Sequence, residues 1–245
     1  MCNKPKKTLI ISSKYRSNSS DSTYDFTYNN HKDIYYKYLR IKYVSLPLSF
    51  YNISAFNQNN LFLFNEGGGT LTATITDGIY SLDEYITELK TQLDAAGALT
   101  YTVVKSNTTY DLTISATGSF EIEWTGFSTR ALEIFTNDGS ADSGSATSFT
   151  AGPILLSTPT IINIFSTLGS YGQVEYNDKK SKNLLISAPI SPYSQGEIFT
   201  YTTELDTFEL DSYRSLSQIT MQLRDENDNF IDLNGLDWIV SVEYW

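Results

Sequence analysis

Short β-prone runs alternate with turn residues along almost the whole chain, and this pattern limits the fold more than any other feature. Runs rich in Ile, Val, Thr, Tyr and Phe are bounded by clusters of Asn, Asp, Ser and Gly, roughly every 8–12 residues. β-branched and aromatic side chains suit a pleated sheet, whereas the bounding residues suit tight turns. Because these strands do not alternate with helices, the pattern favours a sandwich or jelly roll over a doubly wound α/β fold.

Two runs are the clearest strands. Residues 33–46 read DIYYKYLRIKYVSL and stop at Pro47, which cannot donate to a strand ladder. Their more apolar face, expected to be covered, consists of Tyr35, Lys37, Leu39, Ile41 and Tyr43. Residues 238–245 read WIVSVEYW, and one face is wholly apolar or aromatic. That face, expected to point into the core, consists of Trp238, Val240, Val242 and Tyr244.

Residues 81–96 form the one prominent helix that the sequence predicts. Ser81 and Glu84 have the spacing of a capping box, and Gly97 stands where a helix C-cap is expected. An apolar stripe at helical spacing is made by Leu82, Tyr85, Ile86, Leu89 and Leu93. Residues 130–135 suit either a short helix or a strand, and residues 136–152, rich in Ser, Gly, Thr, Ala and Asp, predict a long surface loop.

Together these patterns predict an all-β chain, a single jelly-roll sandwich over residues 8–245, with one helix and a long inserted loop region. Residues 1–7 are expected to be a flexible basic arm. Residues 1–42 hold nine Lys or Arg against three acids, although the whole chain has a net charge of −11. A basic arm of this kind could contact phosphate, and the alternative is a solvated terminus.

Cysteine and hydropathy exclude several protein classes. Cys2 is the only cysteine, so no disulfide can form within the chain, and a disulfide-stapled secreted domain is excluded. The apolar run Leu9–Ile11 is too short for a signal peptide, and no stretch approaches the length of a membrane span. We therefore expect folding in a reducing compartment.

The sequence predicts no catalytic residues, no cofactor and no metal site. His31, the only histidine, lies in NNHKD and is expected to be an exposed turn residue. Gly67–Gly69 lack the Lys-Ser/Thr of a P-loop and suit a hairpin turn. The acidic segment 225–237 lacks the Gly and Glu of a calcium loop at Phe230 and Leu236. Glu121 and Glu123 share one strand face, which is typical of solvated surface.

Four segments, in order, resemble the penton (vertex) capsid proteins of virophages and Polinton-like viruses. These segments are LPLSFYNI at residues 46–53 with Asn59 and Asn60, ITDGIYSLDEYITEL at 75–89, the pair TYTVV and YDLTI, and residues 219–245. Together they make up about a quarter of the chain. Residues 125–200 carry no part of the likeness, so this stretch could hold an insertion or a different outer region.

The resemblance implies a non-enzymatic structural virion protein that forms homopentamers at icosahedral vertices. The implied partners are further copies of the chain, a neighbouring major capsid protein and, for the basic arm, a weak contact with packaged DNA. The implied location is the capsid, after assembly in the host cytoplasm or a virus factory. Two alternatives stay open: a minor capsid, spike-base or glycan-binding attachment protein on a β-sandwich, and an enzyme such as a glycosidase.

Overall fold

The computed structural model describes residues 5–137, 139–169, 174–176, 179–181, 184–190, 196–202 and 207–245. The chain divides into two compact units. Unit 1 consists of Met1–Phe50 and Pro159–Trp245, and unit 2 is the intervening Tyr51–Thr158. The sequence pattern predicts one domain over residues 8–245 with a possible insertion within residues 125–200, and unit 2 spans residues 51–158. Alternation of apolar and polar residues indicates strands that are buried on one side, but it does not indicate which of two cores each strand covers.

Unit 1 is a β-sandwich built from seven strands that form one continuously hydrogen-bonded sheet. Its strands are β1 (Lys7–Ser12), β2 (Asp25–Pro47), β8 (Ile161–Ser166), β11 (Leu184–Pro189), β12 (Ile198–Thr202), β13 (Thr207–Arg224) and β14 (Ile239–Tyr244). Two 3-10 turns, η1 (Ser13–Tyr15) and η3 (Thr167–Gly169), and a short separate ladder of β9 (Val174–Tyr176) with β10 (Lys179–Ser181) complete it.

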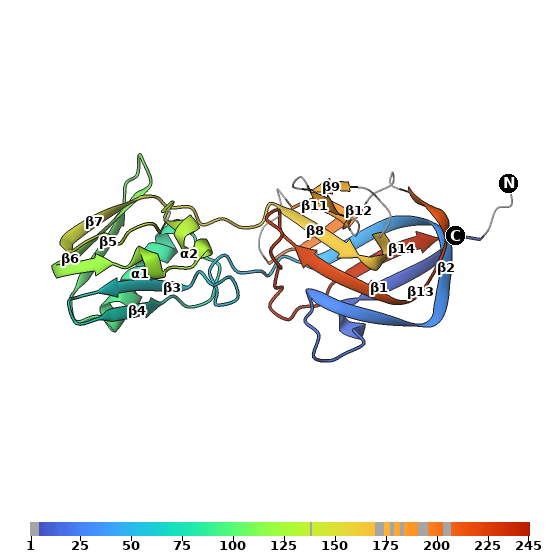
Figure 1. Ribbon diagram of the computed structural model, residues 1–245, viewed down its shortest axis with the longest axis horizontal. Coiled ribbons are helices and arrows are strands. Elements are labelled where there is room, and N and C mark those ends of the chain that lie inside the picture. Colours follow the sequence, from blue (N-terminus) through green and yellow to red (C-terminus); the bar gives the residue numbers. More distant parts are fainter. Residues whose placement is uncertain are drawn as a thin grey trace. The chain divides into compact units, whose positions relative to one another are not determined.

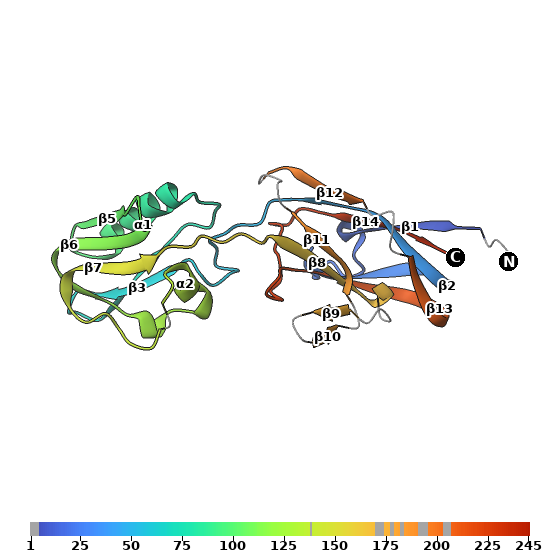
Figure 2. The same ribbon diagram turned by 90° about the horizontal axis from the view of Figure 1, so that it is seen from above.

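The long strand β2 belongs to both layers of this sandwich (Figures 1 and 2). Its first part pairs with β13, which continues to β8 and β11, whereas its last part lies between β14 and β12, with β1 beyond β14. The two layers are therefore β2–β13–β8–β11 and β1–β14–β2–β12. Two four-stranded layers around one core are the jelly-roll arrangement, which confirms the predicted fold class.

The covered face of β2 changes along the strand, so the predicted face is right for Leu39 and Ile41 and wrong for Tyr35. Ile34 and Tyr36 are buried in its middle, Leu39 and Ile41 are buried further along, and Tyr35 is exposed. The pairing shifts register opposite Tyr36–Tyr38 and again opposite Ile41–Tyr43. Each irregularity moves the inward positions by one residue, so a strict period of two does not hold along the whole strand.

The alternation predicted for residues 238–245 is confirmed. Trp238, Val240 and Val242 are fully buried, and Tyr244 packs against the same core. The indole Nε1 of Trp238 donates a 2.6 Å hydrogen bond to the carbonyl oxygen of Thr23. A buried indole needs such a partner, so Trp238 both fills the core and fastens the segment before β2.

The basic arm is only partly within the described residues. Residues 1–4 lie outside them, but Lys7 already begins β1, which pairs with β14 from Lys7 opposite Tyr244 to Ser12 opposite Ile239. Ser13 then donates a 2.7 Å hydrogen bond to the carboxylate of Asp237. Within the described residues, regular structure thus begins at Lys7, inside the predicted arm.

Unit 2 pairs a five-stranded sheet with helices around its own core. Its elements are β3 (Leu61–Asn65), β4 (Thr70–Thr74), α1 (Leu82–Ala96), β5 (Tyr101–Lys105), β6 (Asp111–Ile122), η2 (Trp124–Gly126), α2 (Thr129–Ile134) and β7 (Ala146–Pro153). The order is β4–β3–β6–β5, with β7 pairing along β6 (Figure 1). α1 packs against β4 and β5.

The predicted helix begins and ends as expected. Ser81 Oγ accepts from the Glu84 backbone N–H, and the Glu84 carboxylate accepts from the Ser81 N–H at 2.8 Å, which completes the capping box. Tyr85, Leu89 and Leu93 form its buried face.

The predicted surface loop 136–152 is wrong for its second half, because β7 occupies Ala146–Pro153. Its outward hydroxyls pair across the ladder with β6, as Thr150 with Thr113 at 3.1 Å and Ser148 with Ser115 at 2.8 Å. Phe149 points the other way and meets Phe120 edge to face. Low-complexity composition hid a strand whose polar face is made of small hydroxyl residues.

Candidate functional site

The single cysteine and the single histidine of the chain do not form a described site. Cys2 lies outside the described residues. His31 lies within β2, which runs unbroken over Asp25–Pro47, so the predicted turn position is wrong. The side chain of His31 is also outside the described part of the structure.

The glycine run forms the hairpin turn that the sequence predicts. Gly67 and Gly69 have φ values of +94° and +119°, which residues with a Cβ rarely adopt. Asn65 Oδ1 accepts hydrogen bonds from the backbone N–H of Gly67 at 2.7 Å and of Gly69 at 3.2 Å. These amides are therefore satisfied by the turn itself.

Glu121, near the end of β6, and Glu123, just after it, both lie beside Asn65 of β3. Glu121 lies opposite Asn65 in the ladder between β3 and β6, and the Asn65 amide donates a 3.1 Å hydrogen bond to Glu123. Both glutamates therefore lie where β6 pairs with β3. Within the described residues, no group of three or more His, Cys, Asp or Glu is placed to hold a metal ion.

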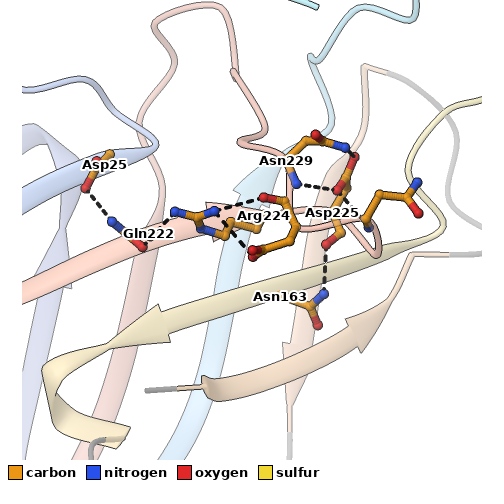
Figure 3. A network of polar contacts seen from close by, with 8 residues as sticks. Asp25, Asn163, Gln222, Arg224, Asp225 and Asn229 are labelled. Atoms are coloured by element: carbon orange, nitrogen blue, oxygen red, sulfur yellow. Dashed lines mark hydrogen bonds and ion pairs between the residues drawn. The ribbon is translucent and has the colours of Figure 1, made fainter. Parts of the chain in front are cut away.

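The acidic turn after β13 is held by its first carboxylate (Figure 3). Asp225 accepts from the backbone N–H of Asn227 at 2.9 Å and of Asn229 at 2.8 Å, and from the Asn229 side-chain amide at 3.0 Å. Asp228 has a φ of +67°, a conformation that Asp tolerates in turns. Asp225 therefore acts as an internal cap for the turn.

Arg224 ties this turn to the outer surface of unit 1. Its guanidinium donates to the carbonyl of Asp228 at 2.8 Å and to Gln222 at 3.3 Å, and Gln222 in turn donates to Asp25 on β2 (Figure 3). The same guanidinium lies 4.1 Å from the ring centroid of Phe230. Together, the hydrogen bonds and the ring contact suit the planar guanidinium of Arg better than the ammonium of Lys.

A second hydrogen-bond network, centred on Asn52, closes the loop at residues 51–60 of unit 2. The Asn52 side chain donates to the carbonyl of Tyr80 and accepts from its N–H, both at 2.9 Å. Asn59 donates to the Asn52 carbonyl at 2.7 Å, and Ile53 pairs with Gly78 as an isolated bridge. Asn52 is buried, so its side-chain amide has lost its contact with water. Its hydrogen bonds to Tyr80 compensate for that loss.

The sequence alone predicts no structural role for these asparagines. Asn52 and Asn59 nevertheless belong to the first segment that carries the family resemblance, and Gly78 and Tyr80 belong to the second. The structure thus brings two of the resembling segments into one hydrogen-bonded feature.

Glu66 fixes the segment between α1 and β5. Its carboxylate accepts from the N–H groups of Ala98 at 2.8 Å and Leu99 at 3.2 Å and from the Tyr101 hydroxyl at 2.9 Å. Burial acts to raise the pKa of Glu66, but these hydrogen bonds together hold its pKa below the usual 4.5. For Tyr101, burial and then the Glu66 hydrogen bond raise the pKa.

Charge is distributed unevenly between the two units. Residues 51–158 hold twelve acids and three basic residues, a net charge of −9, so unit 1 carries only −2 of the total of −11. Within unit 1, residues 1–42 contribute +6. A polyanion would be repelled by unit 2 and attracted to the N-terminal segment of unit 1.

The two layers of unit 1 and the inserted unit 2 define a single jelly-roll protein with a second β-rich unit between β2 and β8. No family model matches the chain, and no curated protein matches it. Among solved structures, the chain is similar to the selenomethionine-labelled penton protein of mavirus, with 10% sequence identity and a TM-score of 0.43. The match covers 98% of this chain and 99% of that chain. None of the helices in the described residues is long and apolar enough to cross a membrane.

Proposed function

We propose that the chain is a structural subunit of a virus capsid, of the penton type, that assembles as a homopentamer at the vertices of an icosahedral shell. The observation that carries the proposal is the contact between two separated segments that resemble penton proteins. Asn52 and Tyr80, one from each segment, form two hydrogen bonds with each other. The residues that resemble penton proteins therefore meet in the folded chain.

The architecture of unit 1 suits a shell protein. A jelly roll buries its apolar faces between two sheets and leaves short edges and loops for contacts with neighbours. Identical subunits around a closed axis make heterologous contacts, in which one surface of each copy meets a different surface of the next. In this role the partners are other copies of the chain and a neighbouring major capsid protein, and the location is the virion.

The assembly state of the purified chain tests this function. Native mass spectrometry and negative-stain electron microscopy should show rings of five subunits. Particles that stay monomeric over a broad range of protein and salt concentrations would contradict the proposal. A soluble monomer that binds glycans on an array would instead favour an attachment protein.

The basic N-terminal segment provides a separate test of contact with packaged DNA. We expect weak binding of double-stranded DNA that falls steeply with salt, because each phosphate contact releases counterions. Replacing Lys4, Lys6 and Lys7 by Ala should reduce the salt dependence measured by fluorescence anisotropy. Replacing Lys90 and Lys105 of unit 2 is the matched control and should leave it unchanged.

A further inference from the structure

The layer β1–β14–β2–β12 has an uncovered strand at each end. Within the described residues, β1 pairs only with β14, and β12 pairs only with β2. Each of these strands therefore has one row of backbone N–H and C=O groups that no described strand occupies. Such edges are templates for pairing with another chain.

Neither edge has the features by which soluble proteins usually block such pairing. β12 reads IFTYT, without charge or proline, and its ladder with β2 has no register shift. β1 reads KTLIIS, with a lysine only at its first position, and its ladder with β14 is equally regular. Natural sheets protect free edges with charges, prolines or bulges. Two regular, nearly uncharged edges on one layer therefore favour pairing of each edge with a strand of another chain.

Both edges also present an isoleucine to solvent. Ile10 on β1 is 55% exposed and Ile198 on β12 is 68% exposed, whereas their neighbours Ile11 and Phe199 are buried. Since buried and outward residues alternate along each strand, Ile10 and Ile198 lie on the outer face of the same layer. If the two edges met, these side chains could cover one another.

The strand directions permit that meeting with every copy facing the same way. β1, β14, β2 and β12 are each antiparallel to the next, so β1 and β12 run in opposite directions. When β12 of one copy lies beside β1 of the next, the join is antiparallel and the outer face is continuous.

We propose that neighbouring subunits join by antiparallel pairing of β12 in one copy with β1 in the next, with Ile198 and Ile10 packed on the outer face. The inference rests on the proposed function, because it identifies the contact between copies in the ring. A contact between two different edges is heterologous, as a closed ring requires.

Cysteine cross-linking tests the contact directly. In a Cys2→Ser background, Ile10→Cys is combined in turn with Ile198→Cys, Thr200→Cys or Thr202→Cys, which all lie on outward positions of β12. Treatment with a short bis-maleimide should give a ladder of up to five linked subunits for at least one pair. Each single variant should give no ladder, and a mixture of two single variants should give only linked dimers. Val104→Cys, exposed on β5 of unit 2, is the control and should not cross-link.

The outcomes separate the contact from the proposed function. Rings of five by native mass spectrometry, without a ladder for any pair, would overturn the edge contact and leave the capsid role standing. The absence of rings would overturn both. As a second measurement, Ile198→Lys should convert rings into folded subunits with an unchanged circular dichroism spectrum, since a charge on an edge strand blocks pairing. Intact rings of Ile198→Lys would also overturn the edge contact.

Discussion

The indole of Trp245 stacks on the ring of Tyr38, with 5.6 Å between the ring centroids and 14° between the ring planes. The backbone N–H of each residue donates to the carbonyl of the other at 3.1 Å, and the ammonium of Lys6 lies 4.8 Å from the centroid of the Trp245 ring. The segment after β14 is thus fastened to β2 at the point where β2 passes between the two layers.

Trp245→Ala should therefore lower the stability of unit 1. Loss of the stacked ring and its partly buried area should cost about 1–3 kcal/mol, and Trp245→Phe should cost less because it keeps an aromatic ring. Urea denaturation of the full chain measures both. Tyr15→Ala, which removes a side chain that is 67% exposed, is the control and should change little. Equal effects of the Trp245 and Tyr15 variants would show that the stack contributes nothing.

Truncation after Gly235 should abolish soluble protein and rings. It removes the fully buried Trp238, Val240 and Val242, each of which contributes about 1.5–3 kcal/mol, from a domain that is stable by only about 5–15 kcal/mol. It also separates β1 from β2, since β14 lies between them. Expression and gel filtration measure the outcome. A soluble, assembled truncated protein would mean that β14 is peripheral.

Asp225→Ala should destabilise unit 1 by about 1–3 kcal/mol, because it leaves the N–H groups of Asn227 and Asn229 without their acceptor. Asp232→Ala, on the neighbouring turn and with a single backbone hydrogen bond, should cost less. Because the Asp225 carboxylate is already used by the turn, adding calcium or a chelator should leave the melting temperature of the unaltered chain unchanged. A rise of several degrees with calcium would contradict this account.

The stability of unit 2 should fall in acid through protonation of Glu66. The folded-state pKa of Glu66 is below its usual 4.5, so its stabilisation is complete above that value and is lost as pH falls through the folded pKa. Glu66→Gln should weaken unit 2 at neutral pH and flatten the acid dependence. Fluorescence follows this, because Trp124 is the only Trp of unit 2. Glu133→Gln, an exposed control, should keep the acid dependence of the unaltered chain.

Gly97→Ala should disturb the same carboxylate by steric means. Gly97 has an ordinary φ of −102°, but a Cβ there would overlap the Glu66 carboxylate and lie 3.2 Å from the Phe64 ring. We expect a loss of about 1–3 kcal/mol, the usual cost of overpacking. Gly68→Ala meets no atom within 4 Å and is the matched control. A fully tolerated Gly97→Ala would mean that Glu66 can move without cost.

Local patterns predicted the elements whose signals are short and self-contained. The Ser81–Glu84 box, the Gly67–Gly69 hairpin and the alternation of residues 238–245 each depend on neighbours within a few residues, and each is confirmed. The fold class followed from the same signals, because regular strands between tight turns have few ways to close a core.

Other features depend on partners that are distant in sequence. The covered face of β2 changes because its partners change from β13 to β14, and no local pattern of β2 contains that information. β7 is a strand because its hydroxyls meet those of β6, more than thirty residues earlier. The hydrogen bonds between Asn52 and Tyr80 could likewise not be predicted from the sequence, since amide side chains give no periodic signal.

The pairing of β1 with β14 also orders events during synthesis. β1 consists of residues 7–12 and must wait for residues 239–244 before its layer can form, whereas every strand pair of unit 2 lies within residues 51–158. Contacts between such distant segments form slowly. On the ribosome, unit 2 can reach its native state while β1 and the long β2 still lack partners. The stretch of greatest risk for aggregation is therefore the oldest part of the nascent chain, and a chaperone that acts on this protein would be needed there first.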